Sequence, residues 1–283
     1  MSSRASTPLP HPVVVTGAST GIGRATTERL ARAGTPVIAG VRKQADYDAL
    51  AAIPGVEPVI LDVTKADDVA ALAERVRGTA ISGLVNNAGS ALPGPLEALP
   101  LDDLRAQFEL NVFSCVAMAQ ATIPALRLGR GRIVNIGSIG GRVGQAYVGA
   151  YCGSKGAIHL MTASMRQELR PWKIWVACVE PGTIATEIWG KGESSAEGLM
   201  NSMSPEHQTL YGARLSTMRD LVGRQTERAL APDDVAERIE HALTARRPKG
   251  YYLIGHDARF LDTMQRVLPV RARDRLLARL LGV

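Results

Sequence analysis

The sequence predicts an α/β protein whose parallel β-sheet is covered by helices on both faces. Between residues 13 and 179, short runs of β-branched residues alternate with longer segments of helical character. Strands separated by helices are joined by right-handed crossovers, and such crossovers produce parallel sheets. With 46% hydrophobic and 21% charged residues, the 283-residue chain can bury an ordinary globular core, which excludes a disordered, collagen-like or coiled-coil protein.

The expected elements follow one another in a regular order. The expected strands are Val13–Val15, Val37–Val41, Val56–Leu61, Ile81–Val85, Arg132–Ile136, Ile174–Val179 and Tyr251–Ile254. The expected helices are residues 22–33, 44–52, 66–77, 101–127 and 151–170. Thr64 and Asp67 form the pattern of a capping box before the third helix. Pro232 suits the first turn of a further helix, where its missing N–H is not needed.

The regular alternation stops after the sixth strand. Residues 182–231 are mixed in charge and contain Gly, Ser and Met without a strand pattern, so we expect an insert within the same domain. We expect residues 1–11 to be a flexible N-terminus and residues 256–283 to be an amphipathic tail. Because there is no internal repeat and no linker, residues 1–283 are expected to form a single domain.

The tail permits two interpretations. Its leucine stripe and its nearby arginines are Leu276, Leu277, Leu280, Leu281, Arg273, Arg275 and Arg279. Packing of the stripe against the protein or a subunit partner is the interpretation that we favour. The alternative is a basic amphipathic helix lying on an anionic membrane.

The composition excludes several classes of protein. Three cysteines without a CxxC pair and five dispersed histidines predict neither a disulfide framework nor a metal site. The net charge of +6 is scattered and accompanied by only 4% aromatic residues, so no nucleic-acid partner is expected. Residues Met1–Pro12 lack the apolar run of a signal peptide, and no run of about 18 uncharged apolar residues follows. We therefore expect a cytoplasmic protein.

A glycine-rich turn follows the first expected strand. It runs Thr16-Gly17-Ala18-Ser19-Thr20-Gly21-Ile22-Gly23. Glycines allow the backbone to turn tightly and to approach a pyrophosphate, whose charge the following helix N-terminus stabilises. Such a turn also occurs in ordinary strand–helix connections, but after the first strand of a β-α-β unit it indicates a dinucleotide site.

A second group of residues indicates proton-transfer chemistry. Lys155 follows Tyr151 by one helical turn, so both side chains share a face. A lysine ammonium close to a phenol favours the phenolate and lowers a pKa that is ordinarily near 10. Ser138 lies at the end of the fifth strand, where its hydroxyl can hold a substrate oxygen. Tyr147 is followed four residues later by Tyr151 and not by lysine, so Tyr151 is the better candidate.

Taken together, these motifs resemble those of the short-chain dehydrogenase/reductase family in its single-domain form. The motifs are Thr16-Gly17-x-x-x-Gly21-x-Gly23, Asn86-Asn87-Ala88-Gly89, Asn111, Ser138, Tyr151-x-x-x-Lys155 and Pro181-Gly182. The segments Ile81–Gly89 and Val179–Gly182 look most like the retinol and hydroxysteroid dehydrogenase branch. The resemblance implies a Rossmann-type doubly wound parallel sheet of about seven strands and NAD(P)-dependent interconversion of alcohols and carbonyls.

The resemblance also implies roles for four catalytic residues. Tyr151 donates a proton to the carbonyl oxygen, or removes it in the reverse direction, and Ser138 hydrogen-bonds that oxygen. Lys155 lowers the pKa of the phenol and binds the nicotinamide ribose. Asn111 positions water for a proton relay to Lys155. A non-catalytic NAD(P)-sensing protein on the same fold is the alternative, but such a protein has little reason to keep all four residues.

The cofactor site follows from the same resemblance. The residues expected to bind the cofactor are Gly17, Ser19, Thr20, Gly21, Ile22, Gly23, Arg42, Asp62, Val63, Asn87, Ala88, Gly89, Tyr151, Lys155, Pro181, Gly182, Ile184 and Thr186. The second strand ends in Arg42, without a carboxylate before Asp46, and the guanidinium suits a 2′-phosphate. NADP(H) is therefore favoured. NAD(H) stays open because Thr20 is neutral where many NADP-dependent members carry a basic residue.

The substrate and the assembly are predicted on the same basis. The expected substrate-binding residues are Ser138, Leu92, Val143, Tyr147, Tyr151 and Trp189, and residues 182–231 form the substrate-binding insert. These mostly apolar side chains predict a bulky apolar ketone, aldehyde or secondary alcohol, such as a steroid-, retinoid- or polyketide-like compound. Arg142 is the only obvious cation for an anionic substrate group. A homodimer or homotetramer formed through residues 101–127 and 151–170 is expected.

Overall fold

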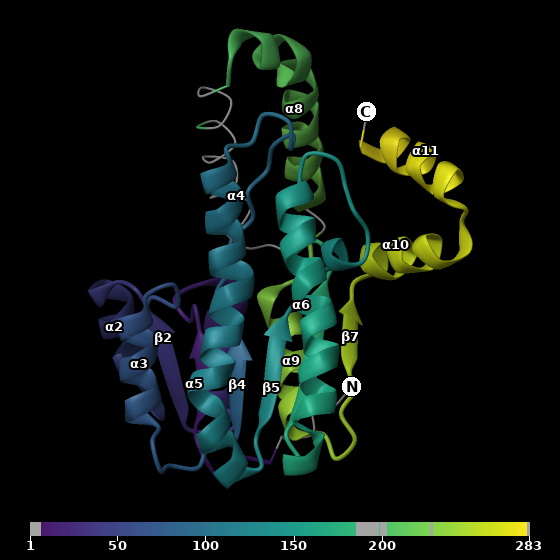
Figure 1. Ribbon diagram of the computed structural model, residues 1–283. Helices are drawn as coiled ribbons and strands as arrows, with labels where there is room; N and C mark the ends of the chain where they lie inside the picture. Colours follow the sequence, from purple (N-terminus) through teal and green to yellow (C-terminus); the bar gives the residue numbers. More distant parts are fainter. Residues whose placement is uncertain (1–6, 185–197, 199–202, 227–228, 282–283) are drawn as a thin grey trace.

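Seven parallel strands form one sheet in the order β3-β2-β1-β4-β5-β6-β7 (Figure 1). The computed structural model describes residues 7–184, 198, 203–226 and 229–281. The strands are β1 (Val13–Thr16), β2 (Val37–Val41), β3 (Val56–Ile60), β4 (Gly83–Asn86), β5 (Arg132–Ile136), β6 (Trp175–Pro181) and β7 (Tyr251–Ile254). The prediction of a doubly wound parallel sheet of about seven strands is confirmed. The strand order reverses between β1 and β4, which places a topological switch point at their carboxyl ends.

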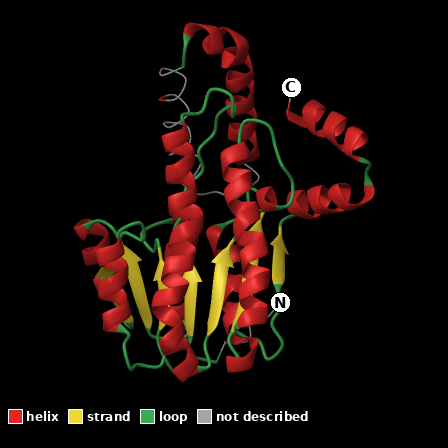
Figure 2. Ribbon diagram, viewed as in Figure 1, coloured by secondary structure: helices red, strands yellow, loops and turns green. Residues whose placement is uncertain are grey.

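The central strands are apolar because helices cover both faces of the sheet (Figure 2). Every residue of β1, β2 and β4 is buried. Within β1, Val13 and Val15 face one core and Val14 faces the other, as the two-residue period of a strand requires. The register aligns Val13 with Val37 of β2 and with Gly83 of β4.

Helices from separate parts of the chain close the two cores. On one face α1 (Gly21–Arg32), α2 (Gln44–Ala51) and α9 (Pro232–Thr244) contribute Leu30, Leu50 and Ile239. The other face is covered by α3 (Ala66–Arg75), α5 (Ser114–Gly129) and α6 (Gly149–Glu168). Leu72 of α3, Leu126 of α5 and Leu169, which directly follows α6, belong to this core. Pro232 stands in the first turn of α9, as its position in the sequence predicts.

The helix expected over residues 101–127 is interrupted. It consists of α4 (Leu101–Phe108), a π-helical turn η1 (Glu109–Phe113) and α5, and the π turn contains Asn111. Turns of this kind occur mostly at functional sites. By length and composition alone the continuous stretch Leu101–Gly129 could span a membrane, and 44% of its most apolar window is buried in the protein. A core helix passes the same test, and α5 packs on the sheet through Met118 and Leu126.

Two local expectations differ from the structure. α3 begins after Lys65 without a side-chain cap, and Thr64 donates a hydrogen bond to Asp62 instead of forming the capping box. Near the N-terminus, the backbone N–H groups of Leu9 and His11 donate to Thr35 and Ser82. These two positions are therefore attached to the fold, whereas we expected residues 1–11 to be flexible. Residues 1–6 of that segment lie outside the described residues.

In the described parts of the expected insert and tail, the chain forms helices that stand at the carboxyl end of the sheet (Figure 1). α8 (Pro205–Thr226) occupies part of the expected insert, and its Leu215 packs with Leu99 and Ala150. The tail forms α10 (His256–Val267) and α11 (Val270–Leu281). Leu276 and Leu277 of α11 pack in a cluster with Ile139 and Val143. This contact corresponds to the interpretation in which the leucine stripe packs against the protein itself.

Candidate active site

The glycine turn after β1 has a backbone that only glycine accommodates. Gly17 and Gly21 adopt φ angles of 64° and 55°, in the left-handed region that other residues disfavour. A Cβ atom at Gly23 would lie 2.2 Å from the Gly17 carbonyl oxygen. α1 begins at Gly21, and neither a side-chain cap nor an acidic residue occupies its first turn. The turn therefore presents a helix N-terminus to which an anion can bind.

The turn is held by the asparagine motif after β4. The Asn87 side-chain amide donates to the carbonyl oxygens of Thr16 and Gly17, at 2.9 and 3.0 Å. In return, the Thr16 hydroxyl accepts the backbone N–H groups of Asn87 and Ala88, each at 3.0 Å. These bonds cross the switch point of the sheet, so the two motifs form one rigid unit.

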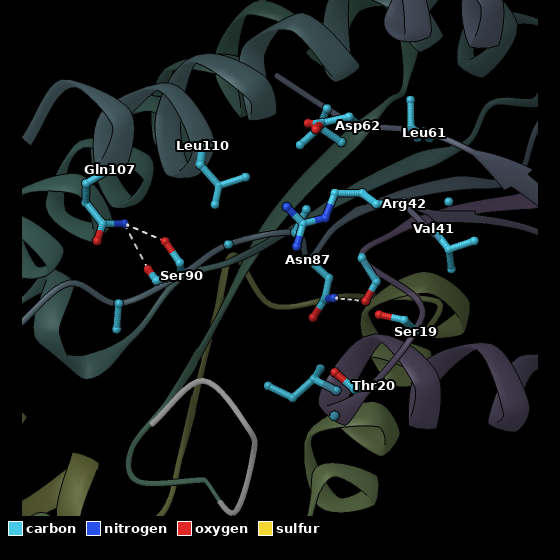
Figure 3. A pocket seen from close by; sticks show the side chains of 18 of the residues that line it. Ser19, Thr20, Val41, Arg42, Leu61, Asp62, Asn87, Ser90, Gln107 and Leu110 are labelled. Atoms are coloured by element: carbon cyan, nitrogen blue, oxygen red, sulfur yellow. Dashed lines mark hydrogen bonds between the residues drawn. The ribbon is translucent and has the colours of Figure 1, made fainter. Parts of the chain in front are cut away.

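A cleft of about 420 Å³ opens at this switch point (Figure 3). Residues expected from the sequence that line it are Gly17, Ser19, Thr20, Gly21, Ile22, Arg42, Asp62, Val63, Asn87, Ala88, Gly89 and Leu92. Ser90 and Ala91 line it as well, and the lining residues that the sequence reasoning missed are Gly40, Val41, Leu61, Asp103, Ala106, Gln107 and Leu110. Gly40, Val41 and Leu61 were open to prediction, since they lie at the carboxyl ends of β2 and β3. Asp103, Ala106 and Gln107 lie on α4, and nothing in their sequence pattern indicates that this helix borders the cleft.

Arg42 and Asp62 place opposite charges at one end of the cleft (Figure 3). Arg42 is exposed at the end of β2, and Asp62 follows β3. Partial burial raises the pKa of the Asp62 carboxyl, but hydrogen bonds from Thr64 and the nearby Arg42 charge lower it overall. Asp62 is therefore ionised at neutral pH, and the Arg42 guanidinium stays available to a ligand in the cleft because it is exposed.

Ser138 and Tyr151 are brought together beyond the end of β5. Ser138 begins the 3₁₀ turn η2 (Ile139–Gly141), and its Oγ accepts the Gly140 N–H at 3.1 Å. Burial raises the pKa of Tyr151 to about 12, and a hydrogen bond with Ser138 opposes part of this rise. A Cβ atom at Gly140 would contact the Tyr151 ring at 3.4 Å and Ser138 Oγ at 3.5 Å, so the turn packs directly on both.

Lys155 is close to Tyr151 but bonds elsewhere. Its Nζ donates to the Ile136 carbonyl oxygen at 2.7 Å and lies 5.8 Å from the centroid of the Tyr151 ring. Burial lowers the pKa of the Lys155 ammonium. Burial of the phenol thus raises the pKa of Tyr151 overall in this structure, and the role of Lys155 in lowering that pKa stays a prediction.

Asn111 anchors the loop after β4. From the π turn, its Oδ1 accepts the Ser90 N–H at 3.0 Å, and its Nδ2 donates to the Ser90 carbonyl and to Ser154 Oγ. A Cβ atom at Gly89 would lie 3.0 Å from Asn111 Oδ1 and 3.6 Å from Lys155 Nζ. Asn111 and Lys155 therefore approach each other at Gly89, which lines the cleft.

Pro181, Gly182 and Ile184, which are also expected to bind the cofactor, are not among the described residues that line the cleft. Pro181 ends β6, and the Gly182 N–H donates to the Ile254 carbonyl at 2.8 Å. Ile184 is buried in the core with Leu230 beside it. Thr186 and Trp189 lie outside the described residues. Within the described part of the chain, no group of three or more His, Cys, Asp or Glu side chains is arranged to hold a metal ion.

The expected substrate residues separate into two groups. Leu92 lines the cleft, and Tyr147 packs edge-on against Tyr211 of α8 at 6.3 Å between ring centroids. Val143, in contrast, is fully buried in a cluster with Met264 and Leu277 of the tail helices. Its assignment to the substrate pocket is therefore corrected: the tail covers it.

Comparison with known proteins assigns the family. A sequence model of the short chain dehydrogenase family matches residues 11–197. The NADPH-dependent 3-dehydrocapnine reductase of Ornithobacterium rhinotracheale is 30% identical, over 93% of this chain and 94% of that protein. Retinol dehydrogenase 16 of Rattus norvegicus is 32% identical, over 93% of this chain and 86% of that protein.

A solved structure agrees with these relatives. A short chain dehydrogenase from Burkholderia cenocepacia, crystallised in complex with NADP, superposes with a TM-score of 0.74 and is 29% identical. The superposition covers 97% of this chain and 98% of that one. The chain thus belongs to the short-chain dehydrogenase/reductase family of NAD(P)-dependent oxidoreductases, in its retinol dehydrogenase-like branch.

Proposed function

We propose that the protein is an NADP(H)-dependent oxidoreductase that interconverts a bulky apolar ketone or aldehyde and its alcohol. The observation that carries the proposal is the hydrogen-bonded pair of Ser138 and Tyr151. The pair packs against the 3₁₀ turn η2 and lies beside Lys155. A phenol, a hydroxyl and an ammonium at one point can bind a carbonyl oxygen and give it a proton.

The cleft fits NADP(H). The glycine turn lines it, and at the N-terminus of α1 this turn leaves no acidic residue or side-chain cap in the way of a pyrophosphate. At the other end Arg42 offers a planar guanidinium to a 2′-phosphate. The Burkholderia structure holds NADP and the Ornithobacterium reductase uses NADPH, which supports the same choice for this chain.

The residues of the chain then have distinct tasks. The chemistry that NADP(H) would supply, when held in the cleft, is hydride transfer to or from the carbonyl carbon of the substrate. In reduction Tyr151 Oη transfers its proton to the carbonyl oxygen, and Ser138 Oγ hydrogen-bonds that oxygen as charge develops on it. Because burial raises the pKa of Tyr151 to about 12, the phenol carries its proton at neutral pH, as a proton donor must. Asn111 fixes the loop at Ser90 and approaches Lys155.

The surroundings of Tyr151 favour an apolar substrate. Leu92 and Tyr147 lie in an apolar cluster with Leu99, Met203 and Ala150, the residue that precedes Tyr151 in α6. The named activity of the retinol dehydrogenase relatives supports a substrate of this class, because retinol is a bulky apolar alcohol. A non-catalytic sensor of NAD(P) is the less favoured alternative, since a sensor has no need of the Ser138–Tyr151 pair.

Oxidation of NADPH with a panel of apolar ketones and aldehydes tests the function, with NADH measured in parallel. We expect turnover with NADPH, and we expect Tyr151→Phe to lose at least about 100-fold in kcat, since a positioned proton donor contributes roughly 10²–10⁴-fold. Tyr151→Phe should still bind NADPH in a fluorescence titration, because Tyr151 is not among the residues that line the cleft. Undiminished turnover by Tyr151→Phe would refute the mechanism, and cofactor binding without any turnover would favour the sensor.

We also propose a homodimer or homotetramer in the cytoplasm. Support for the assembly comes from apolar side chains exposed on η1 and α6, namely Phe113, Leu160 and Met161, with Leu160 68% exposed. Burial of such side chains against a second copy is favourable. The location is supported by three buried cysteines with free thiols, which suit a reducing compartment.

A further inference from the structure

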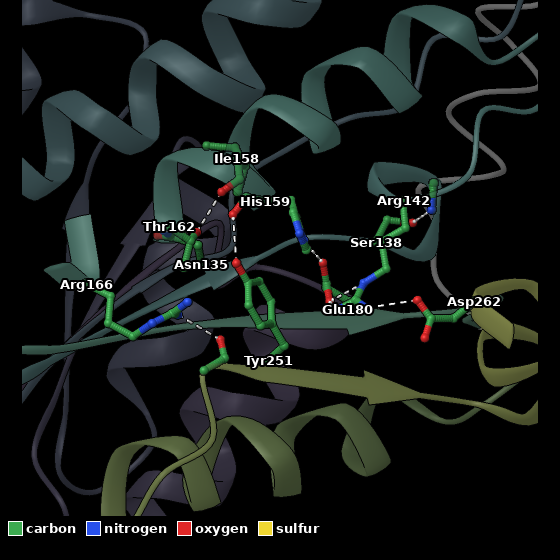
Figure 4. Close-up of polar contacts among 12 residues, drawn as sticks. Asn135, Ser138, Arg142, Ile158, His159, Thr162, Arg166, Glu180, Tyr251 and Asp262 are labelled. Atoms are coloured by element: carbon green, nitrogen blue, oxygen red, sulfur yellow. Dashed lines mark hydrogen bonds and ion pairs between the residues drawn. The ribbon is translucent and has the colours of Figure 1, made fainter. Parts of the chain in front are cut away.

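A network of polar side chains with a buried carboxylate at its centre lies beside Ser138 (Figure 4). At its centre Glu180 of β6 is fully buried. One carboxylate oxygen lies 2.5 Å from His159 Nδ1 of α6, and the other accepts Arg142 Nε and Nη2 at 2.9 and 2.5 Å. Arg142 Nη1 donates to Asp262 of α10 at 2.9 Å. The network therefore joins α6, β6, the end of η2 and the C-terminal helix α10.

Arg142 connects the two carboxylates through its geometry. The planar guanidinium presents several N–H donors in a fixed fork, which allows it to bond Glu180 and Asp262 at the same time. Its side chain is only 13% exposed, and the guanidinium lies 5.2 Å from the centroid of the Tyr251 ring. Removing one partner of a buried ion pair leaves a buried charge without compensation, so the position of Arg142 is strongly determined.

The backbone of Arg142 belongs to the turn that begins at Ser138. The Gly141 N–H donates to the Ser138 carbonyl and the Arg142 N–H to the Ile139 carbonyl, both at 2.9 Å. A Cβ atom at Gly141 would lie 2.7 Å from the carbonyl oxygen of Lys155, so the turn also rests on the backbone of α6. A displacement of Arg142 thus moves Ser138 relative to the helix that carries Tyr151 and Lys155.

Helix α10 holds the neighbouring turn as well. Asp257 Oδ2 accepts the Thr183 N–H at 2.7 Å, just beyond the end of β6. A Cβ atom at Gly182 would lie 2.3 Å from Asp257 Oδ1. Ala258 and Met264 of α10 pack against Ile139 of the Ser138 turn. One helix near the C-terminus therefore contacts the turns after both β5 and β6.

We propose that Arg142 and Asp262 are positioning residues for the reaction, which tie the Ser138 turn to helix α10 and so set the geometry between Ser138 and Tyr151. Neither residue lines the cleft, so they act through Ser138 and not by contact with the cofactor. The inference rests on the proposed function, because it assigns these residues to the carbonyl chemistry of Ser138 and Tyr151.

The test compares Asp262→Asn with Asp262→Glu and with the control Asp274→Asn, all in the full-length protein. Asp274 lies on the same tail and pairs with the adjacent Arg273 at the surface, outside the network. We expect Asp262→Asn to lower kcat by about tenfold, equivalent to about 1.4 kcal/mol of transition-state stabilisation, while KM for the carbonyl substrate and Kd for NADPH change less than about twofold. Asp262→Glu keeps a carboxylate and should restore part of kcat, and Asp274→Asn should match the wild type.

Hydrogen exchange supplies a readout independent of activity. In Asp262→Asn and in Arg142→Lys, the amides of Gly140 to Val143 should exchange at least about tenfold faster, whereas those of the glycine turn after β1 should not change. Unchanged exchange in the Ser138 turn, or a kcat within about twofold of wild type, overturns the proposal. A wild-type protein that reduces no carbonyl compound refutes the proposed function instead, and the exchange data then still decide whether α10 holds the turn.

Discussion

The raised pKa of Tyr151 makes a prediction about stability at high pH. Burial raises this pKa from its ordinary value of 10.0 to about 12 in the folded protein, against the opposing hydrogen bond from Ser138. The unfolded chain exposes the phenol, which then ionises near pH 10. Because the neutral phenol is favoured in the fold, its contribution to stability is fully present below about pH 10 and is lost as the pH rises towards 12.

The size of the effect follows from the two pKa values. One pKa unit corresponds to about 1.4 kcal/mol, so the loss between about pH 10 and about pH 12 is at most about 2.7 kcal/mol. At about pH 11, half of that amount, about 1.4 kcal/mol, should be lost. These figures are upper values because Tyr151 as a whole residue is not completely shielded from solvent, which screens part of the penalty.

Urea unfolding of the wild type and of Tyr151→Phe, at about pH 8 and about pH 11, measures this contribution. Burial also raises the pKa values of the Cys115 and Cys178 thiols, but both proteins carry these thiols, so the difference between them isolates Tyr151. The wild type should lose up to about 1.4 kcal/mol more than the variant on going to the higher pH. Equal losses would refute the reasoning, as would a difference in phenolate absorbance between wild type and Tyr151→Phe whose midpoint lies at or below about pH 10.

Three further predictions concern the cofactor cleft and the assembly. Arg42→Ser should lower the preference for NADPH over NADH in kcat/KM by roughly 10- to 150-fold, since hydrogen bonds to a charged group contribute about 1.5–3 kcal/mol; an unchanged ratio would show that Arg42 does not contact the 2′-phosphate. Gly23→Ala should destabilise the fold by about 1–3 kcal/mol in urea unfolding and weaken NADPH binding, because the added Cβ meets the Gly17 carbonyl oxygen at 2.2 Å. The matched Gly212→Ala, which has open space around it, should be neutral or slightly stabilising. In sedimentation, the wild type should run as a dimer or tetramer and Leu160→Glu as a smaller species; a monomeric wild type would contradict the proposed assembly.

The sheet and the cleft at the carboxyl ends of its strands could be predicted because both are encoded in short, continuous stretches of the sequence. A strand that is buried on both faces is a continuous apolar run, as β2 is, and β2 has the predicted bounds. The strands β5 and β7, marked by their β-branched or aromatic residues, have the predicted bounds as well. The glycine turn is likewise encoded in consecutive residues, whose backbone angles and close contacts only glycine allows. Position at the carboxyl end of a parallel strand then brings Arg42, Asp62 and Asn87 to one cleft.

The parts that could not be predicted depend on contacts between distant residues. α8 has Gly212 in its interior and only a weak apolar stripe, so its helical form follows from packing against Leu99 and Ala150. The spacing of Tyr151 and Lys155 shows that they share a helix face, but not that Lys155 bonds to Ile136 on a neighbouring strand. Val143 was misassigned for the same reason, since the helix that buries it lies more than 100 residues later in the sequence.

Arg142 shows how such distant contacts bear on the substrate. From the sequence it is a free cation near Ser138, available to a carboxylate or phosphate of an anionic substrate. In the structure its guanidinium is bonded to Glu180 and Asp262, and Glu180 is fully buried. An anionic substrate group that took Arg142 would leave the Glu180 carboxylate without its main counter-charge in a buried site, which is strongly unfavourable. The charge of Arg142 is therefore committed to the fold, which supports the proposal of an uncharged substrate, and Leu92 and Tyr147 lie in an apolar cluster that suits such a compound.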